Sequence, residues 1–126
     1  MPHITLEYST NLPALPELAT AFGALHAALA PLGPFAIDDF KSRAHPTAAY
    51  TVGDGTATRA YAHLTVGVLD RRDADVQRRV ADAALAWLEA TFAGCVAGLD
   101  VDLTVEVREM RAALYRKARV RPERAP

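Results

Sequence analysis

The chain has 126 residues, 51% of them hydrophobic, and its 14 Lys and Arg against 15 Asp and Glu give a formal net charge of −1. This length and apolar content provide for one domain with a buried core and exclude a disordered chain. The balanced charge excludes a general attraction to nucleic acid or to an anionic membrane surface.

The first half of the chain predicts a strand, a helix and a second strand. Apolar and polar side chains alternate over residues 3–8, directly behind Pro2, which is typical of a half-buried strand. Pro16 suits the first turn of a helix that the Pro-Leu-Gly-Pro segment 31–34 ends. The second strand is expected over about 36–45. The apolar face of the helix consists of Leu18, Phe22, Leu25 and Leu29.

The second half repeats this order after Asp54-Gly55, a dipeptide that favours a hairpin turn. Residues 61–69 alternate as a strand, and Asp73 is a good N-cap for a helix that Gly94 ends. Residues 101–108 alternate apolar and polar side chains and form the clearest strand pattern in the chain. The apolar side of the second helix consists of Val76, Val80, Ala83, Trp87 and Leu88.

This order predicts an α+β fold, built as a duplicated β-α-β unit in a single domain over residues 1–126. The two halves span roughly 2–50 and 58–110, and a C-terminal arm covers 111–126. Each helix would join two strands by a right-handed connection, so that both helices cover one face of a four-stranded mixed sheet. The sequence holds no third helix for the other face. We therefore expect an apolar sheet face that a partner subunit buries.

Pro2 is the first candidate for catalysis. A small residue behind the initiator methionine favours removal of Met1, which would leave proline with a free secondary amine. An α-amino group has a pKa of about 7.7–8.0, and burial or positive neighbours would lower it. A neutral amine held at the head of a strand is a usable general base. Met-Pro is also a common start in proteins where the proline has no such role.

Basic residues provide candidate anion sites. Lys41, Arg43 and His45 stand two residues apart, so a strand places them on one face. Their mutual repulsion favours a bound anion, and an arginine fork suits a carboxylate, although a solvated strand face is the alternative. Arg72 lies directly before the Asp73 cap, where a helix start adds positive potential. For Arg72 the alternative is an ordinary surface charge.

The remaining features have structural interpretations. His63 is expected to be a hydrogen-bonded structural histidine, and Cys95, the only cysteine, a buried thiol among small apolar neighbours. The basic tail around Tyr115 is either a phosphate-contacting patch or an arm that holds a neighbouring subunit. Neither a signal peptide nor an apolar run long enough to span a bilayer is visible, so we expect a cytoplasmic protein.

Together these residues make the chain similar to the 5-carboxymethyl-2-hydroxymuconate isomerase family of the tautomerase superfamily, over nearly its whole length. The markers are the opening Met1-Pro2-His3, the Lys-Ser-Arg-Ala-His block at 41–45 and the Tyr-Ala-His-Leu-Thr stretch at 61–65. Further positions where that family has equivalents are Arg72, Leu114 and Lys117.

The resemblance implies a tautomerase-like fold, a homotrimer, and Pro2 as an acid/base that needs no metal or cofactor. Pro2 would move a proton in an unsaturated 2-hydroxy polycarboxylate, in the breakdown of aromatic compounds such as homoprotocatechuate. Arg43 and Arg72 match arginines of the family pattern. Lys41 stands where the family commonly has a substrate-binding arginine, and lysine keeps the charge but loses the bidentate fork. This departure leaves the identity of the substrate open.

Two other functions remain open at this point. One is a tautomerase-fold enzyme of another specificity, acting on a different keto-enol substrate or as a dehalogenase. The other is a non-catalytic oligomeric binding protein. A retained Met1 would favour this second alternative, because the nitrogen of Pro2 would then be an amide without a basic lone pair.

Overall fold

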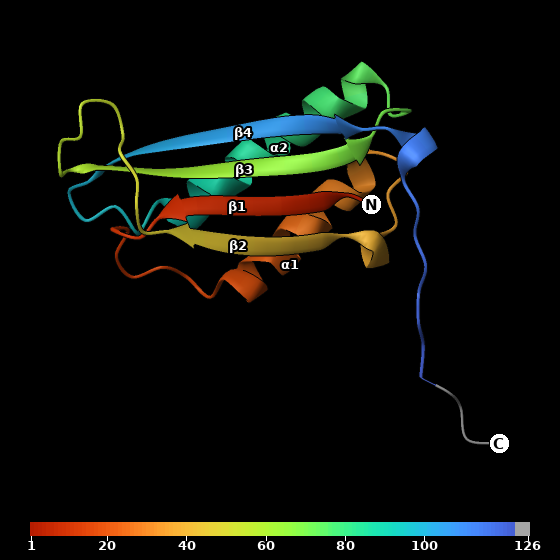
Figure 1. Cartoon of the computed structure of the whole chain (residues 1–126), viewed down its shortest axis with the longest axis horizontal. Coiled ribbons are helices and arrows are strands. Elements are labelled where there is room, and N and C mark those ends of the chain that lie inside the picture. Colours follow the sequence, from red (N-terminus) through yellow and green to blue (C-terminus); the bar gives the residue numbers. More distant parts are fainter. Residues whose placement is uncertain (123–126) are drawn as a thin grey trace.

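The computed structural model describes residues 1–122 and shows one four-stranded sheet with two helices on the same face (Figure 1). The parallel pairs β1/β2 and β3/β4 are joined by an antiparallel β1/β3 pair, in the order β2-β1-β3-β4. This is the predicted α+β fold of two β-α-β units. The elements are β1 (His3–Ser9), α1 (Leu18–Leu29), β2 (Lys41–Thr47), β3 (Arg59–Leu69), α2 (Ala74–Phe92) and β4 (Asp100–Met110), with single 3-10 turns η1 (Ala30–Leu32), η2 (Ile37–Asp39) and η3 (Ala112–Leu114).

The core lies between the sheet and the two helices. In the central strands the register pairs Ile4 with Val66 and Leu6 with Leu64, and all four side chains are fully buried. The helices close this layer from one side, and each fully buried side chain of this size contributes about 1.5–3 kcal/mol. Their buried residues are Phe22, Leu25 and Leu29 from α1 and Val80, Ala84, Leu88 and Phe92 from α2.

The sheet face away from the helices is polar, so the expectation of an apolar face was wrong. The Tyr61 hydroxyl donates to the Glu7 carboxylate, and His63 Nδ1 lies 2.6 Å from the hydroxyl of Thr104. His63 is therefore hydrogen-bonded, as predicted. An antiparallel arrangement commonly leaves one face solvated with polar side chains.

The second strand starts later than predicted, because residues 37–39 form the turn η2 before β2 begins at Lys41. Two consecutive aspartates disfavour a strand there. The Asp54-Gly55 pair makes no hairpin, since β2 and β3 lie on opposite sides of β1. It lies in a loop that crosses the end of β1 (Figure 1), where the Asp54 side chain accepts hydrogen bonds from Thr56.

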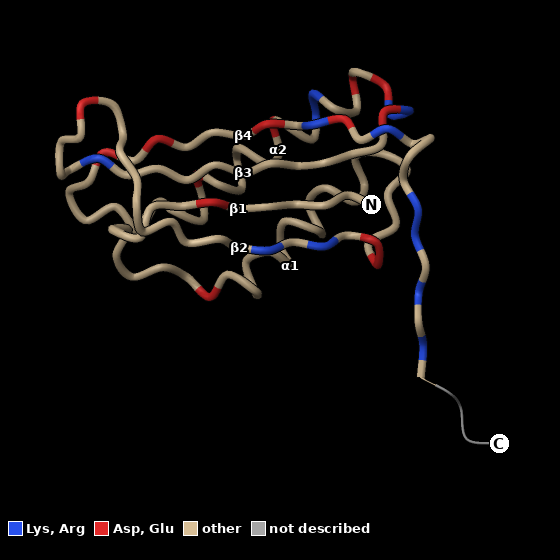
Figure 2. Tube along the Cα trace, viewed as in Figure 1, with Lys and Arg blue, Asp and Glu red and all other residues tan. Residues whose placement is uncertain are grey.

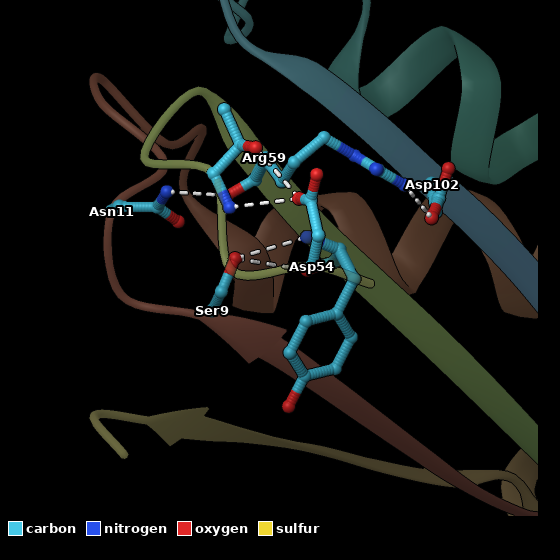
Figure 3. Close-up of polar contacts among 7 residues, drawn as sticks. Ser9, Asn11, Asp54, Arg59 and Asp102 are labelled. Atoms are coloured by element: carbon cyan, nitrogen blue, oxygen red, sulfur yellow. Dashed lines mark hydrogen bonds and ion pairs between the residues drawn. The ribbon is translucent and has the colours of Figure 1, made fainter. Parts of the chain in front are cut away.

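Polar contacts tie the loops to the sheet where β1 ends (Figure 3). The hydroxyl of Ser9 accepts from the N–H of Tyr61 at 3.0 Å, and the Asn11 amide donates to the carbonyl of Arg59 at 2.9 Å. Arg59 also pairs with Asp102 at 3.1 Å. An exposed pair of this kind contributes at most about 1 kcal/mol, so the backbone contacts brace this end more than the charges do.

Two further predictions concern α2 and the cysteine, and both are confirmed. The Asp73 carboxylate accepts from the N–H of Val76 at 2.9 Å, so Asp73 is the N-cap of α2. Cys95 is buried, with its Sγ 3.4 Å from the carbonyl of Ala14. Within residues 1–122, none of the helices is both long enough and apolar enough to cross a bilayer.

Candidate active site

One end of the sheet collects segments from the whole chain. β1 and β2 begin there, and β3 and β4 finish there, because β1 and β3 are antiparallel. Pro2, Lys41 and Arg72 therefore share this end, although up to 70 positions separate them in the sequence. Figure 2 shows Lys and Arg on β2 and along the C-terminal segment, with the acidic turn η2 between them.

Pro2 is fully buried at this end. Its carbonyl accepts from the N–H of Lys41 at 3.2 Å, which extends the pairing of β1 with β2 by one residue. The amine of Met1 donates to the main-chain carbonyl of Asp39 at 2.8 Å. Backbone contacts therefore hold both sides of the ring while Met1 is present, and the contact of Pro2 with Lys41 does not depend on Met1.

The N-terminal amine lies among charges of both signs. Burial is the main cause that lowers the pKa of the Met1 amine below its usual range, and the positive charges of Lys41, Lys117 and Arg72 lower it further. The carboxylate of Asp39 acts in the opposite direction and raises this pKa. An amine at this place is therefore shifted toward its neutral form, which is the form that accepts a proton.

Arg43 contacts the neighbour of Pro2. Its Nη2 lies 3.0 Å from Nδ1 of His3, and Nε2 of His3 lies 3.1 Å from the hydroxyl of Tyr115. A guanidinium can only donate, so Nδ1 accepts and Nε2 carries the proton. The pKa of His3 is lowered, first by burial and then by the charge of Arg43. A neutral imidazole thus links β2 to the C-terminal segment.

Arg72 stands between β3 and α2. Its guanidinium carbon lies 5.5 Å from the centroid of the Phe35 ring, and its carbonyl accepts from the amide of Gln77 at 3.0 Å. Among the residues that the structure describes, its Nε is buried and has no hydrogen-bond partner. A buried donor of this kind costs free energy until an acceptor reaches it, so Arg72 is suited to bind an anion.

The C-terminal segment folds back onto the same end of the sheet. Lys117 hydrogen-bonds the carboxylate of Asp39, and Arg119 Nη2 lies 3.7 Å from the same carboxylate. With the contact of Tyr115 to His3, this gives the segment a place within its own chain, which neither interpretation of the basic tail anticipated. The part of the predicted arm beyond residue 122 lies outside the described residues.

The structure brings most of the predicted site together. Pro2, Lys41 and Arg72 surround the N-terminus, and Arg43 reaches it through His3. His45 shares the face of Lys41 and Arg43, but it pairs with Glu7 farther along β2 and is not part of this group. Nothing in the sequence indicated the contacts of Asp39. Tyr115 and Arg119 stood out only as part of a basic tail, and their contacts with His3 and Asp39 were not predicted. In residues 1–122 no three His, Cys, Asp or Glu side chains gather as metal ligands would.

Two parallel β-α-β pairs in one sheet, with a buried proline at the head of β1 among cations, define a tautomerase-fold protein. The family model of 5-carboxymethyl-2-hydroxymuconate isomerase matches residues 2–123, and the chain belongs to this family. It is therefore an isomerase of the tautomerase superfamily.

Solved structures agree with this assignment. A 5-carboxymethyl-2-hydroxymuconate isomerase from Deinococcus radiodurans R1 is 29% identical, with a TM-score of 0.82 over 93% of this chain and 88% of its own. A 5-carboxymethyl-2-hydroxymuconate delta-isomerase at 24% identity has a TM-score of 0.82 over 95% of this chain and 89% of its own. A fused 4-OT, described as a symmetric trimer, shares the fold at 18% identity, with a TM-score of 0.66 over 86% of this chain and 85% of its own. Among curated proteins, no sequence matched this chain.

Proposed function

We propose that the protein isomerises an unsaturated 2-hydroxy polycarboxylate of the 5-carboxymethyl-2-hydroxymuconate kind, with Pro2 as the acid/base once Met1 is removed. The observation that carries this proposal is the burial of Pro2 at the head of β1. The adjacent amine of Met1 has a pKa that is lowered by burial and by three cations. The family assignment supports the reaction class. Such a reaction would serve the breakdown of aromatic compounds.

The proposed chemistry is one proton transfer in two stages. The neutral amine of Pro2 takes the proton of the enol hydroxyl, and the electron pair of that bond becomes the carbonyl π bond. The dienolate electrons shift along the chain of double bonds, and a distant carbon takes the proton back from the ammonium. The product is the conjugated ketone, and no net electron or proton is gained or lost. A positioned base contributes about 10²–10⁴-fold to such a rate.

The cations have two tasks in this proposal. Lys41, Arg43 and Arg72 bind carboxylates of the substrate, and their charge stabilises the oxygen of the dienolate as negative charge develops on it. The arginines offer two parallel N–H donors, whereas Lys41 offers a point charge. The free Nε of Arg72 supports this role, because a carboxylate oxygen would satisfy a donor that has no partner among the described residues.

The assembly is proposed to be a homotrimer. The polar sheet face carries no helix within the described residues, and relatives by fold include a fused 4-OT that forms a trimer. Light scattering coupled to size-exclusion chromatography should then give three times the 13.6 kDa mass of the chain. A monomer at micromolar concentration would contradict this part of the proposal.

The test of the base role compares three forms of the enzyme in an ultraviolet ketonisation assay. Intact mass should first show that Met1 is absent. Pro2→Ala should lower kcat by about 10²-fold or more, since a primary amine without the ring replaces the fixed base. A form with one alanine inserted between Met1 and Pro2 keeps the ring but acylates its nitrogen, and it should lose the activity equally. Turnover at the native rate in the form with the inserted alanine would contradict the proposal.

A further inference from the structure

A cavity of about 550 Å³ lies beside the N-terminus, between the turn before β2 and the C-terminal segment. Its charged lining consists of Asp38, Lys41, Lys117 and Arg119, and Tyr115 adds a hydroxyl-bearing ring. Pro2 is not among its lining residues. The cavity is therefore a neighbour of the proposed proton-transfer site, and apart from Lys41 its lining residues have been given no role in the reaction so far.

The charges around this cavity do not balance. Three cations, Lys41, Lys117 and Arg119, face two carboxylates, those of Asp38 and Asp39. Asp39 takes a hydrogen bond from Lys117, whereas Arg119 stays 3.7 Å away, beyond hydrogen-bond distance. Lys41 donates instead to the main-chain carbonyl of Asp39, at 3.1 Å. One positive charge in excess makes the cavity suited to one more carboxylate.

The pair between Asp39 and Lys117 can be exchanged at low cost. About a third of each side chain is exposed, 31% for Asp39 and 36% for Lys117, and Arg119 is 47% exposed. Ion pairs at such exposure contribute little to stability. A ligand carboxylate can therefore replace Asp39 as the partner of Lys117 and Arg119. The C-terminal segment stays in place, because Tyr115 still contacts His3.

We propose that Lys117 and Arg119 bind the substrate carboxylate that lies farthest from the reacting enol, and that Asp39 holds these two cations in place in the free enzyme. This inference rests on the proposed function, because it assigns a second subsite to the same substrate. It makes Lys117 and Arg119 the residues through which the enzyme distinguishes enols by their number of carboxylates.

The experiment uses 2-hydroxydienoates that carry one, two or three carboxylates. The assays are run at a pH where the terminal amine is neutral in every form, because Lys117 also lowers the pKa of that amine. Lys117→Met and Arg119→Gln should then each lower kcat/KM for the tricarboxylate about tenfold, mainly through KM, and change kcat/KM for the monocarboxylate by less than about twofold. The matched control is Arg121→Gln, which removes an exposed charge two residues beyond Arg119 and outside the lining of the cavity. Arg121→Gln should leave all three substrates within about twofold of the native enzyme.

Binding of inert acids separates this inference from the proposed function. Calorimetry measures the binding of tricarballylate and glutarate without turnover. Lys117→Met should weaken the binding of tricarballylate far more than the binding of glutarate. If no dienol reacts but this difference appears, the reaction is wrong and the subsite stands. Equal losses for all ligands, or no loss for any, would overturn the subsite whatever the enzyme turns over.

Discussion

Arg43 donates to Nδ1 of His3 over 3.0 Å, although 40 positions separate the two residues in the sequence. The contact connects the basic face of β2 to the residue that follows Pro2. It also orients the imidazole, since the guanidinium leaves only Nε2 of His3 to carry the proton toward Tyr115. Three segments of the chain, β1, β2 and the C-terminal segment, are thereby held together at one end of the sheet.

The first prediction concerns the titration of His3. Its pKa in the folded enzyme is below the usual value because of burial and then Arg43, so Arg43→Gln should raise it. Nuclear magnetic resonance of the imidazole protons measures both forms. A pKa of His3 that stays unchanged in Arg43→Gln would contradict the contact.

The same shift makes stability depend on pH. The unfolded chain binds a proton to His3 more readily than the folded chain does, so the free energy of unfolding rises with pH. The contribution of His3 is complete above its unfolded pKa of about 6.5 and is lost as the pH falls from there toward the folded value. Denaturant unfolding between about pH 7 and pH 5 should show this loss, and His3→Gln should flatten the slope.

The second prediction is a shift of the pH–rate profile. With Met1 present, Asp39 raises and Lys41 lowers the pKa of the terminal amine, and we expect the same signs for the amine of Pro2. Activity should be lost as the pH falls through that pKa, because the base becomes protonated. In the plot of kcat/KM against pH, Asp39→Asn should move the fall at acid pH to lower pH, and Lys41→Met should move it to higher pH. Two shifts of the same sign would refute a Coulombic origin.

The third prediction separates binding from chemistry. Arg43→Ala and Arg72→Ala should each raise KM by about tenfold or more, because each removes a charge-assisted donor to a substrate carboxylate. Arg72→Lys keeps the charge but loses the fork, and it should recover only part of the loss. Steady-state kinetics with one substrate measure all three variants. Native KM values in both alanine variants would exclude an anion site here.

The fourth prediction uses two glycines with opposite surroundings. A Cβ on Gly33 would meet Val76 at 2.8 Å and the ring of Phe35 at 2.9 Å. Gly33→Ala should therefore displace Phe35 from beneath Arg72 and raise KM as well as lower stability. Gly23 of α1 is exposed, and a Cβ there meets nothing within 4 Å.

Gly23→Ala is the control for this prediction. It should stabilise the protein by up to about 1 kcal/mol through helix propensity and leave KM unchanged. Denaturant titration and kinetics on both variants give the comparison. A native KM in Gly33→Ala would show that the position of Arg72 does not depend on Phe35.

Much of the local structure could be predicted from the sequence, because short-range chemistry decides it. The alternation of residues 3–8 and 101–108 gave two strands within two residues of their observed limits. Asp73 caps α2 because a carboxylate satisfies free N–H groups in any context. The prediction failed for Asp54-Gly55, because a turn dipeptide fixes the turn but not which strands it joins.

The candidate site was predicted only in part. Pro2, Lys41, Arg43 and Arg72 stood out by residue type and place, and the strand order explains why they meet. Asp39, by contrast, looked like part of a strand and carried no sign of its contacts with Met1 and Lys117.

The sequence by itself therefore determined the strands, the helices, the family and the proline behind Met1, since periodicity and residue order are properties of neighbours along the chain. Only the tertiary structure decided that His3 contacts Arg43 and Tyr115, and that Asp39 holds the C-terminal segment. These contacts join residues 40 to 112 positions apart. They exist because an antiparallel β1/β3 pair brings the starts of two strands and the ends of two others to one edge.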